Sequence, residues 1–140
     1  MDLTPYDKYR GHTQEQIERR VFHVTAPSTE FHKPLLAGGD VAPFRVNWGQ
    51  GEYIKYGAWL GAPWEQHFFT QPRILVRQIM SGRPPRIYAG YTEQELYNIQ
   101  SLFNILLKPV HKDISLKYLL GVLSSKLITF YHANRFLEQA

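Results

Sequence analysis

Basic and amide side chains concentrate in the middle of this 140-residue chain, and these residue types bind nucleic acid. Residues 45–91 carry six Lys/Arg and two Asp/Glu, a net charge of +4 that equals the net charge of the whole chain. Five of these six basic residues are arginine, which can bond through two nitrogens to a phosphate or to the edge of a guanine. We therefore expect a surface that binds double-stranded DNA, with contacts drawn from Lys55, Arg73, Arg77, Gln78, Arg83, Arg86, Asn98 and Gln100.

A predicted strand positions the first of these side chains. Residues 73–79 are crowded with apolar residues, as in a strand that is buried on both faces. Because side chains alternate along a strand, Arg73 and Arg77 should share one face, and Gln78 should lie on the other.

Two predicted turns present the others. The sequence Ser-Gly-Arg-Pro-Pro-Arg at residues 81–86 predicts a turn with Arg83 and Arg86 at its tip. Asn98 and Gln100 follow a second predicted turn, so all four side chains are expected on loops.

These residues also have simpler interpretations, which the sequence leaves open. Arg77 could form an internal ion pair with Glu52 or Glu65. Trp59 and Trp64 lie in a Gly/Pro-containing loop, where they could anchor the core instead of contacting bases. The basic centre as a whole could be a solvated face.

A metal-dependent nuclease is the alternative with the sharpest chemistry. Asp40, Glu52 and Lys55 approach the pattern in which carboxylates and a lysine hold a magnesium ion and a water. The usual pattern has one residue between the acid and the lysine, whereas two separate Glu52 from Lys55. Positions three apart on a strand face opposite sides, so these two cannot converge on one metal unless the strand bulges.

No catalytic set is apparent elsewhere. The chain lacks the Asn/Asp-Pro-Pro-Tyr loop with which an adenine methyltransferase holds its base; Pro84-Pro85 is flanked by arginines instead. Gly49-Gln50-Gly51 lies in a predicted hairpin and not between a strand and a helix, as a cofactor loop would. There is no cysteine, and the six histidines lack metal-ligand spacing. We expect a domain that is not an enzyme by itself and has no metal or cofactor of its own.

The elements around these residues predict an α+β fold, a mixed twisted sheet of about six strands followed by C-terminal helices. Thr92-Glu93-Gln94-Glu95 matches a capping box and predicts a short helical turn. Residues 1–16 show no period and are expected to be a poorly ordered leader, or a junction with an upstream segment, before a single domain at 17–140. Further strands are predicted at residues 21–25, 45–48, 53–56, 86–89 and 101–107, with hairpins closed by residues 49–51 and 81–85.

The pattern changes after Ser115, where apolar residues recur every three or four positions, as on an amphipathic helix. Ser124-Ser125 is expected to divide this segment into two helices, with Ser125 as the second N-cap. We expect the apolar face to pack on the core; the alternative is a protein-docking module that binds a partner helix. The face comprises Leu116, Leu119, Leu120, Leu123, Leu127, Phe130 and Tyr131.

The sequence gives no sign of a membrane or secretory location. The longest apolar run, near residues 119–123, is far shorter than the roughly 20 residues needed to span a bilayer. The N-terminus lacks the basic start and apolar core of a signal peptide. We expect a cytoplasmic protein with no membrane partner.

Several segments, in order, resemble the TaqI-like C-terminal specificity domain of type II, and especially type IIG, restriction-modification enzymes. Residues 33–41 read Lys-Pro-Leu-Leu-Ala-Gly-Gly-Asp-Val, close to a segment that precedes a Trp-Gly turn in such domains. Residues 56–60, Tyr-Gly-Ala-Trp-Leu, and 72–77, Pro-Arg-Ile-Leu-Val-Arg, are similar to later blocks. A Leu-Leu-Asn-Ser-Lys-Leu helix junction appears with Ser124 in the Asn position.

The resemblance runs from about Arg20 to about residue 136 and implies a target recognition domain that reads DNA sequence without chemistry of its own. It implies an attached adenine methyltransferase domain or subunit, where S-adenosylmethionine would bind. Ala37 and Gly39 depart from the family pattern, which often has basic residues there. Without those basic side chains the resemblance does not imply a phosphate contact from this turn. Type I specificity subunits are similar to this domain, so the resemblance is consistent with DNA recognition in a type I or a type II restriction-modification system.

Overall fold

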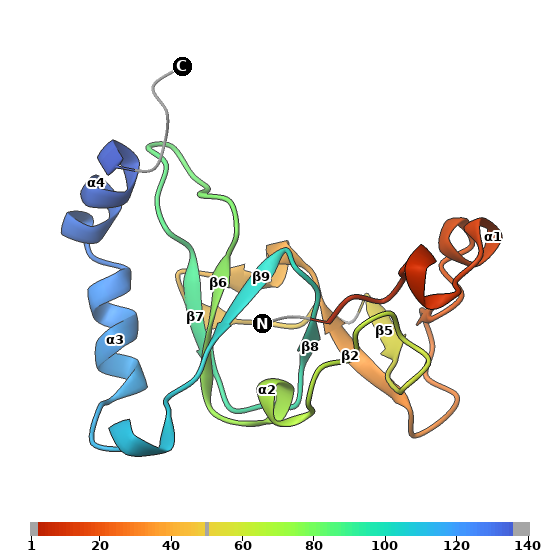
Figure 1. Cartoon of the computed structure of the whole chain (residues 1–140). Helices are drawn as coiled ribbons and strands as arrows, with labels where there is room; N and C mark the ends of the chain where they lie inside the picture. The colour runs from red at the N-terminus through yellow and green to blue at the C-terminus, as the bar shows by residue number, and fades with distance from the viewer. Residues whose placement is uncertain (1–2, 50, 136–140) are drawn as a thin grey trace.

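Two β-sheets and a pair of C-terminal helices form the architecture of this protein, for which a computed structural model describes residues 3–49 and 51–135 (Figure 1). The predicted α+β class is confirmed. The helices are α1 (Gln14–Glu18), α2 (His67–Thr70), α3 (Leu116–Leu123) and α4 (Lys126–Arg135), with 3-10 turns η1 (Lys8–Arg10), η2 (Gly38–Asp40) and η3 (Pro109–His111). The strands are β1 (His23–Val24), β2 (His32–Leu36), β3 (Val41–Ala42), β4 (Phe44–Val46), β5 (Glu52–Lys55), β6 (Arg73–Arg77), β7 (Ala89–Thr92), β8 (Tyr97–Asn98) and β9 (Leu102–Ile105).

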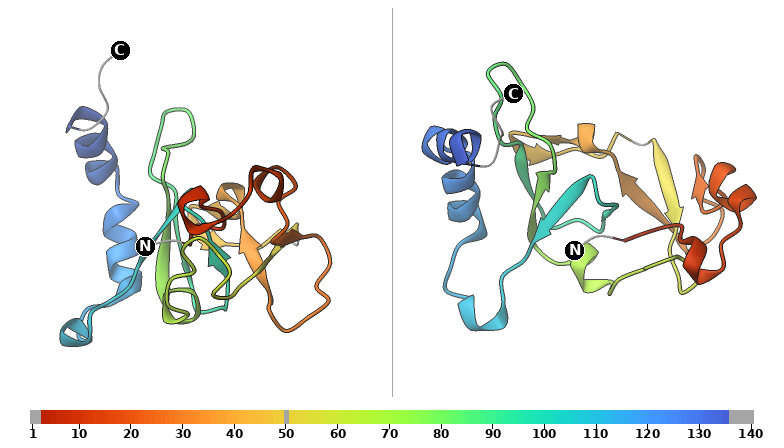
Figure 2. Two further views of the ribbon diagram at one scale, coloured as in Figure 1. Left: turned by 45° about the vertical axis from the view of Figure 1, so that its right-hand side comes forward. Right: turned by 45° about the horizontal axis from the view of Figure 1, so that its top comes forward.

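The strands form two mixed sheets that curl toward each other (Figures 1 and 2). The four-stranded sheet has the order β1-β5-β2-β8, and the five-stranded sheet has the order β3-β4-β7-β6-β9. The β2–β8 and β4–β7 pairs are parallel, and the other pairs are antiparallel. One close approach depends on glycine, since a Cβ on Gly90 of β7 would lie 2.5 Å from the carbonyl oxygen of Arg45 on β4.

The strand predicted from residue 73 is confirmed as β6, next to the edge strand of the larger sheet. It pairs with β7 through Ile74–Tyr91 and with β9 through Ile74–Ile105. Ile74 and Leu75 are fully buried, as expected of a strand covered on both faces. The predicted hairpin from β6 to β7 is therefore present.

The hairpin predicted across residues 49–51 is wrong. The strand before it, β4, pairs with β3 and β7, whereas the strand after it, β5, pairs with β1 and β2 in the other sheet. The reason lies in the cores: Ile54 of β5 packs with Leu35, whereas Val46 of β4 packs against a separate cluster with Val41 and Leu75. The segment between β4 and β5 therefore links the two sheets and does not close a hairpin.

The capping box expected at residues 92–95 does not start a helix. Thr92 ends β7 opposite Arg73, and its hydroxyl accepts a hydrogen bond from the Gln94 amide at 3.1 Å. The Leu96 amide then donates to the Phe69 carbonyl at 3.1 Å, which directs Leu96 into the core. The Thr92–Glu95 pattern therefore closes a turn and does not cap a helix, because the residues that follow it, from Leu96, are buried.

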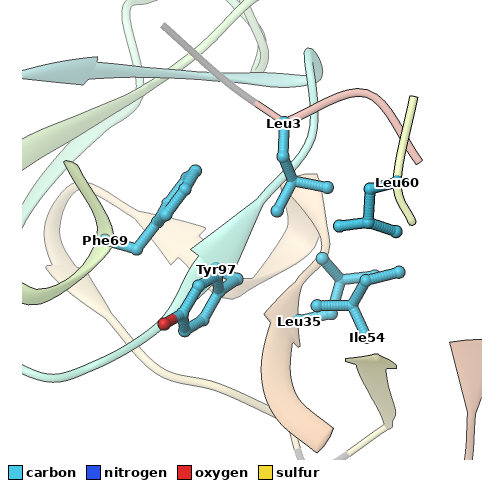
Figure 3. Packing of buried hydrophobic residues seen from close by; sticks show 6 residues of the cluster. All are labelled: Leu3, Leu35, Ile54, Leu60, Phe69 and Tyr97. Carbon is cyan, nitrogen blue, oxygen red and sulfur yellow. The ribbon is translucent and has the colours of Figure 1, made fainter. Parts of the chain in front are cut away.

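The N-terminal segment packs on the smaller sheet, which does not fit the expectation of a poorly ordered leader. Leu3 is 1% exposed, and Thr4 and Ala62 exchange two backbone hydrogen bonds of 2.8 Å. A capping box begins α1, in which Thr13 Oγ1 accepts from the Gln16 amide and Gln16 Oε1 accepts from the Thr13 amide. Leu3 belongs to the cluster of Figure 3, which also contains Leu35, Ile54, Leu60, Phe69 and Tyr97.

The C-terminal helices confirm the predicted division of the last segment. Ser124 ends α3, and Ser125 Oγ accepts from the Ile128 amide at 3.2 Å as the N-cap of α4. The α3 helix covers the larger sheet, with Leu116 and Leu120 packed against Ile74. None of the helices in the described residues has the length and apolar character needed to cross a bilayer.

The apolar face does not stay buried along α4. Leu127 is 73% exposed, Phe130 67% and Tyr131 56%, so the predicted core packing holds for α3 and not for these residues.

Candidate nucleic-acid interface

The loop between β6 and β7 extends beyond the larger sheet and stands beside α4 in all views (Figures 1 and 2). Ser81 and Arg86 close it with two backbone hydrogen bonds of 3.1 and 2.8 Å. Gly82 has a φ of +94°, a conformation that glycine adopts without the strain a side chain would bring. The predicted turn is thus an ordered ribbon whose tip, including Arg83, is solvent-exposed.

Arg77 braces the base of this loop. Its Nε donates to the Val41 carbonyl at 2.8 Å, and its Nη1 donates to Ser81 Oγ at 3.1 Å. Its guanidinium carbon lies 4.5 Å from the centre of the Tyr88 ring, in a cation–π contact. The expected ion pair with Glu52 or Glu65 is not present, and Arg77 instead ties the β6–β7 hairpin to the start of β3.

Polar groups gather at the end of β6. The backbone N–H of Gln78 donates to the Ser101 carbonyl at 3.1 Å, which brings Gln78 beside the turn that contains Gln100. Gln78 and Gln100 are both exposed. A shallow hollow of about 280 Å³ opens here, lined by Gly38, Gly39, Arg77, Gln78, Ile79, Ser81 and Ser101.

The tip of the loop and the start of α4 form a second, larger hollow with a positive lining. Arg83 and Arg86 approach it from the loop, and Lys126 approaches it from α4. Among the described residues, no salt bridge involves any of these three side chains. Their charges are therefore available to an external anion.

Lys126 borders this hollow although the sequence did not single it out as a candidate. It belongs to the Ser-Lys-Leu helix junction that carries the family resemblance, but that motif indicates helix packing when the sequence is considered alone. Its position at the start of a helix could have drawn attention to it. A lysine just after an N-cap serine is not stabilised by the helix dipole, so another reason for its presence could have been sought.

The burial of Arg73 contradicts its assignment to the DNA-binding surface. Its side chain is 0% exposed, and its guanidinium donates to the carbonyls of Gln71 at 2.9 Å, Gln94 at 3.1 Å and Leu96 at 2.7 Å. Burial lowers the pKa of Arg73 to about 10, so the group remains protonated at neutral pH. Arg73 holds the 94–96 turn against β6 and cannot contact a phosphate in the folded domain.

Asn98 is also in the interior, which contradicts its assignment as a base-reading residue. It is 0% exposed, and its Nδ2 donates to the Leu102 carbonyl at 2.9 Å. This bond closes the turn between β8 and β9 and thereby positions the exposed Gln100.

Replacement of Asn98 by alanine should therefore affect stability and not recognition. We expect Asn98→Ala to lower the free energy of unfolding by about 1–3 kcal/mol, because the buried Leu102 carbonyl loses its donor. Urea denaturation measures this, with the exposed neighbour Gln100→Ala as the control that should unfold like the wild type. A normally stable Asn98→Ala protein with weakened DNA binding would restore Asn98 as a base reader.

Lys55 lies away from the other predicted binding residues. It ends β5 in the smaller sheet, on the side of the molecule opposite the β6–β7 loop (Figure 1). Its ammonium lies 5.1 Å from the centre of the Trp59 ring, and its carbonyl accepts from Trp59 Nε1 at 2.7 Å. The structure thus does not bring Lys55 to the surface formed by the hairpin.

The acidic residues of the nuclease alternative have structural partners. Asp40 accepts hydrogen bonds from the amides of Ala37 at 2.9 Å and Gly49 at 3.1 Å, which fix the turn before β3. Glu52 forms a two-pronged ion pair with Arg20, at 2.9 and 3.2 Å. The described part of the chain contains no group of three or more His, Asp or Glu side chains that could hold a metal ion. No observation favours a metal nuclease.

The structure thus places a hairpin that carries Arg83 and Arg86, with its base held by Arg77, beside Lys126 at the start of α4. The family model of the TaqI-like C-terminal specificity domain matches residues 33–140, and the chain belongs to this family. Comparison with the curated proteins gives no significant match.

Membership of this family points to DNA recognition within a restriction-modification enzyme. The resemblance seen in the sequence is confirmed, although the family match begins at Lys33 and not near Arg20. The 38–40 turn, where the basic residues common in the family are absent, lies against Arg77, since Gly39 and Val41 carbonyls both face its guanidinium.

Proposed function

We propose that this chain is the sequence-recognition domain of a type IIG restriction enzyme or a related modification methylase. In this proposal it reads a short duplex site for an adenine methyltransferase domain or subunit of the same enzyme, in the cytoplasm. S-adenosylmethionine would bind in that partner, and this domain would contribute site selection without catalysis. The observation that carries the proposal is the exposed β6–β7 loop, whose cations form no salt bridge with the described residues and whose base is braced by Arg77.

The dimensions of DNA suit such a loop. The major groove of B-form DNA is about 12 Å wide and admits a two-stranded β-ribbon. A ribbon seated in the groove would place Arg83 and Arg86 near the phosphates or guanine edges, the contacts that arginine makes best. Gln78 and Gln100, at the end of β6, are the amides available to read bases beside it.

The brace is important because recognition requires a defined geometry. Arg77 joins β6, the loop and the β3 turn, so the loop is held before DNA arrives. A preorganised loop loses less conformational entropy on binding, which leaves more of the contact energy for affinity. Arg77 therefore acts in this proposal as a positioning residue.

The test is the salt dependence of duplex binding. We expect Arg83→Ala to reduce the slope of log K against log salt by about one, because one phosphate contact is lost. Fluorescence anisotropy with labelled duplexes measures the slope, for the chain alone and with its methyltransferase partner. Lys112→Ala is the matched control: it removes an equal charge from an exposed residue next to η3, which lies at the far end of α3 from the loop (Figure 1).

Two results would contradict the proposal. One is an absence of duplex binding at low salt, with and without the partner. The other is an equal change of slope in Arg83→Ala and Lys112→Ala, which would mean that the loop is not the contact surface.

A further inference from the structure

The hollow between the β6–β7 loop and the α3–α4 junction encloses about 600 Å³. This volume lies within the roughly 300–1,000 Å³ of sites that bind small molecules. It is larger than the hollow beside Gln78, and the function proposed above uses two of its lining residues, Arg83 and Arg86, but assigns no ligand to the hollow itself. Its lining comes from residues 82–88 on one side and 124–130 on the other.

The charged side chains that line this hollow, among the described residues, are all positive. Arg83, Arg86 and Lys126 supply three positive groups, and none of the described residues that line the hollow is acidic. These cations have no salt-bridge partner within residues 3–49 and 51–135. The lining therefore disfavours a cation and favours a ligand that carries negative charge, since three like charges around one hollow repel a cation.

The same hollow presents aromatic surface. The Phe130 ring is 67% exposed although it borders the hollow, which leaves it open to contact. Tyr88 also borders the hollow, and its ring is in contact with the Arg77 guanidinium, which lies 4.5 Å from the ring centre. Thr129, which also borders the hollow, carries a hydroxyl group that can donate or accept a hydrogen bond.

A nucleotide combines the properties that this lining selects. Its base is a flat aromatic group that stacks on an exposed ring, and its phosphate pairs with arginine and lysine. A base inside an intact duplex is stacked on both faces and cannot reach Phe130 without leaving the helix. The lining thus suits a nucleotide that is outside a base-paired stack.

We propose that this hollow binds one unstacked nucleotide unit, with its base against Phe130 and its phosphate on Arg83, Arg86 and Lys126. The proposal rests on the function proposed above in so far as the nucleotide belongs to DNA held by the hairpin. The unit then lies on the α4 side of the loop, while the loop itself occupies the groove. A free nucleotide shares the same chemistry, and the experiment separates the two sources.

The experiment uses the full chain and two labelled duplexes that differ by one unpaired nucleotide, a fluorescent adenine analogue. We expect the duplex with the unpaired base to bind about 5- to 100-fold more tightly, as the gain from stacking one base on an aromatic ring. Binding should also quench the fluorescence of the analogue. Phe130→Ala should abolish both the preference and the quenching, with affinity for the fully paired duplex nearly unchanged.

Leu127→Ala is the matched control, since Leu127 is 73% exposed on the same helix and does not border the hollow. It should retain the preference, and circular dichroism should show both variants folded. Equal affinity of the wild type for the two duplexes together with no binding of a nucleoside monophosphate, or an intact preference in Phe130→Ala, would overturn the proposal. Binding of neither duplex would instead contradict the DNA-recognition function.

A free nucleoside monophosphate provides the third arm. If the wild type binds it, Phe130→Ala does not, and the two duplexes bind equally, the occupant is a free nucleotide and not one in DNA. If the monophosphate does not compete while the unpaired base is preferred, the occupant is a nucleotide within DNA.

Discussion

Replacement of Arg73 by alanine is expected to lower the free energy of unfolding by about 3–5 kcal/mol, although the residue looks like a DNA contact in the sequence. Its buried guanidinium donates to the carbonyls of Gln71, Gln94 and Leu96, and the bond to Leu96 is fully enclosed. Alanine leaves these oxygens without their donor and creates a cavity where the side chain was. For a domain of ordinary stability this loss is a large part of the total.

Urea denaturation followed by circular dichroism measures the effect. Arg73→Lys should be intermediate, because an ammonium keeps the charge but does not reproduce the planar fork that reaches several carbonyls. Arg83→Ala is the control on the same hairpin, and as an exposed residue it should change stability by less than about 0.5 kcal/mol. A stable Arg73→Ala protein that no longer binds DNA would mean that Arg73 leaves the core to contact a phosphate.

Removal of all three cations around the large hollow should have the largest effect on DNA binding. We expect the triple variant Arg83→Ala, Arg86→Ala, Lys126→Ala to lower the slope of log K against log salt by about three. At moderate salt this corresponds to roughly a 10²- to 10³-fold loss of affinity for any duplex sequence. The unfolding midpoint should stay near that of the wild type, because none of the three side chains forms a salt bridge within the described residues.

A second triple variant controls for net charge. Arg10→Ala, Lys108→Ala and Lys112→Ala remove the same total charge from exposed positions outside the hairpin. This protein should bind duplex DNA nearly as well as the wild type. Equal losses in the two triple variants would indicate that the overall charge of the domain, and not the hairpin surface, determines binding.

The elements that depend on local pattern could be predicted from the sequence. The apolar run at β6, the Gly-Pro turn after it and the spacing of leucines in α3 are each visible within a short stretch of sequence. Ser125 was predicted as an N-cap, and its hydroxyl accepts the expected bond from Ile128. In each case the pattern that indicates the element lies within a few residues, even where distant partners complete it, as β7 and β9 do for β6.

The elements that depend on distant partners could not be predicted. β4 and β5 look like one hairpin, yet they separate because Val46 and Ile54 pack in different clusters. Leu3 lies in a segment without period and is nevertheless 1% exposed in the core. A strand edge accepts any extended partner, so local sequence does not specify which sheet it joins.

For the interface, the sequence by itself determined that basic and amide residues concentrate between residues 45 and 100, and its motifs determined the family. Only the tertiary structure decided which of them meet the solvent. Arg73 and Asn98 are enclosed and Arg77 braces the loop, whereas Arg83 and Arg86 stay exposed or partly exposed and are joined by Lys126. An arginine satisfies a buried carbonyl as readily as a phosphate, so its role depends on which oxygen the fold brings to it.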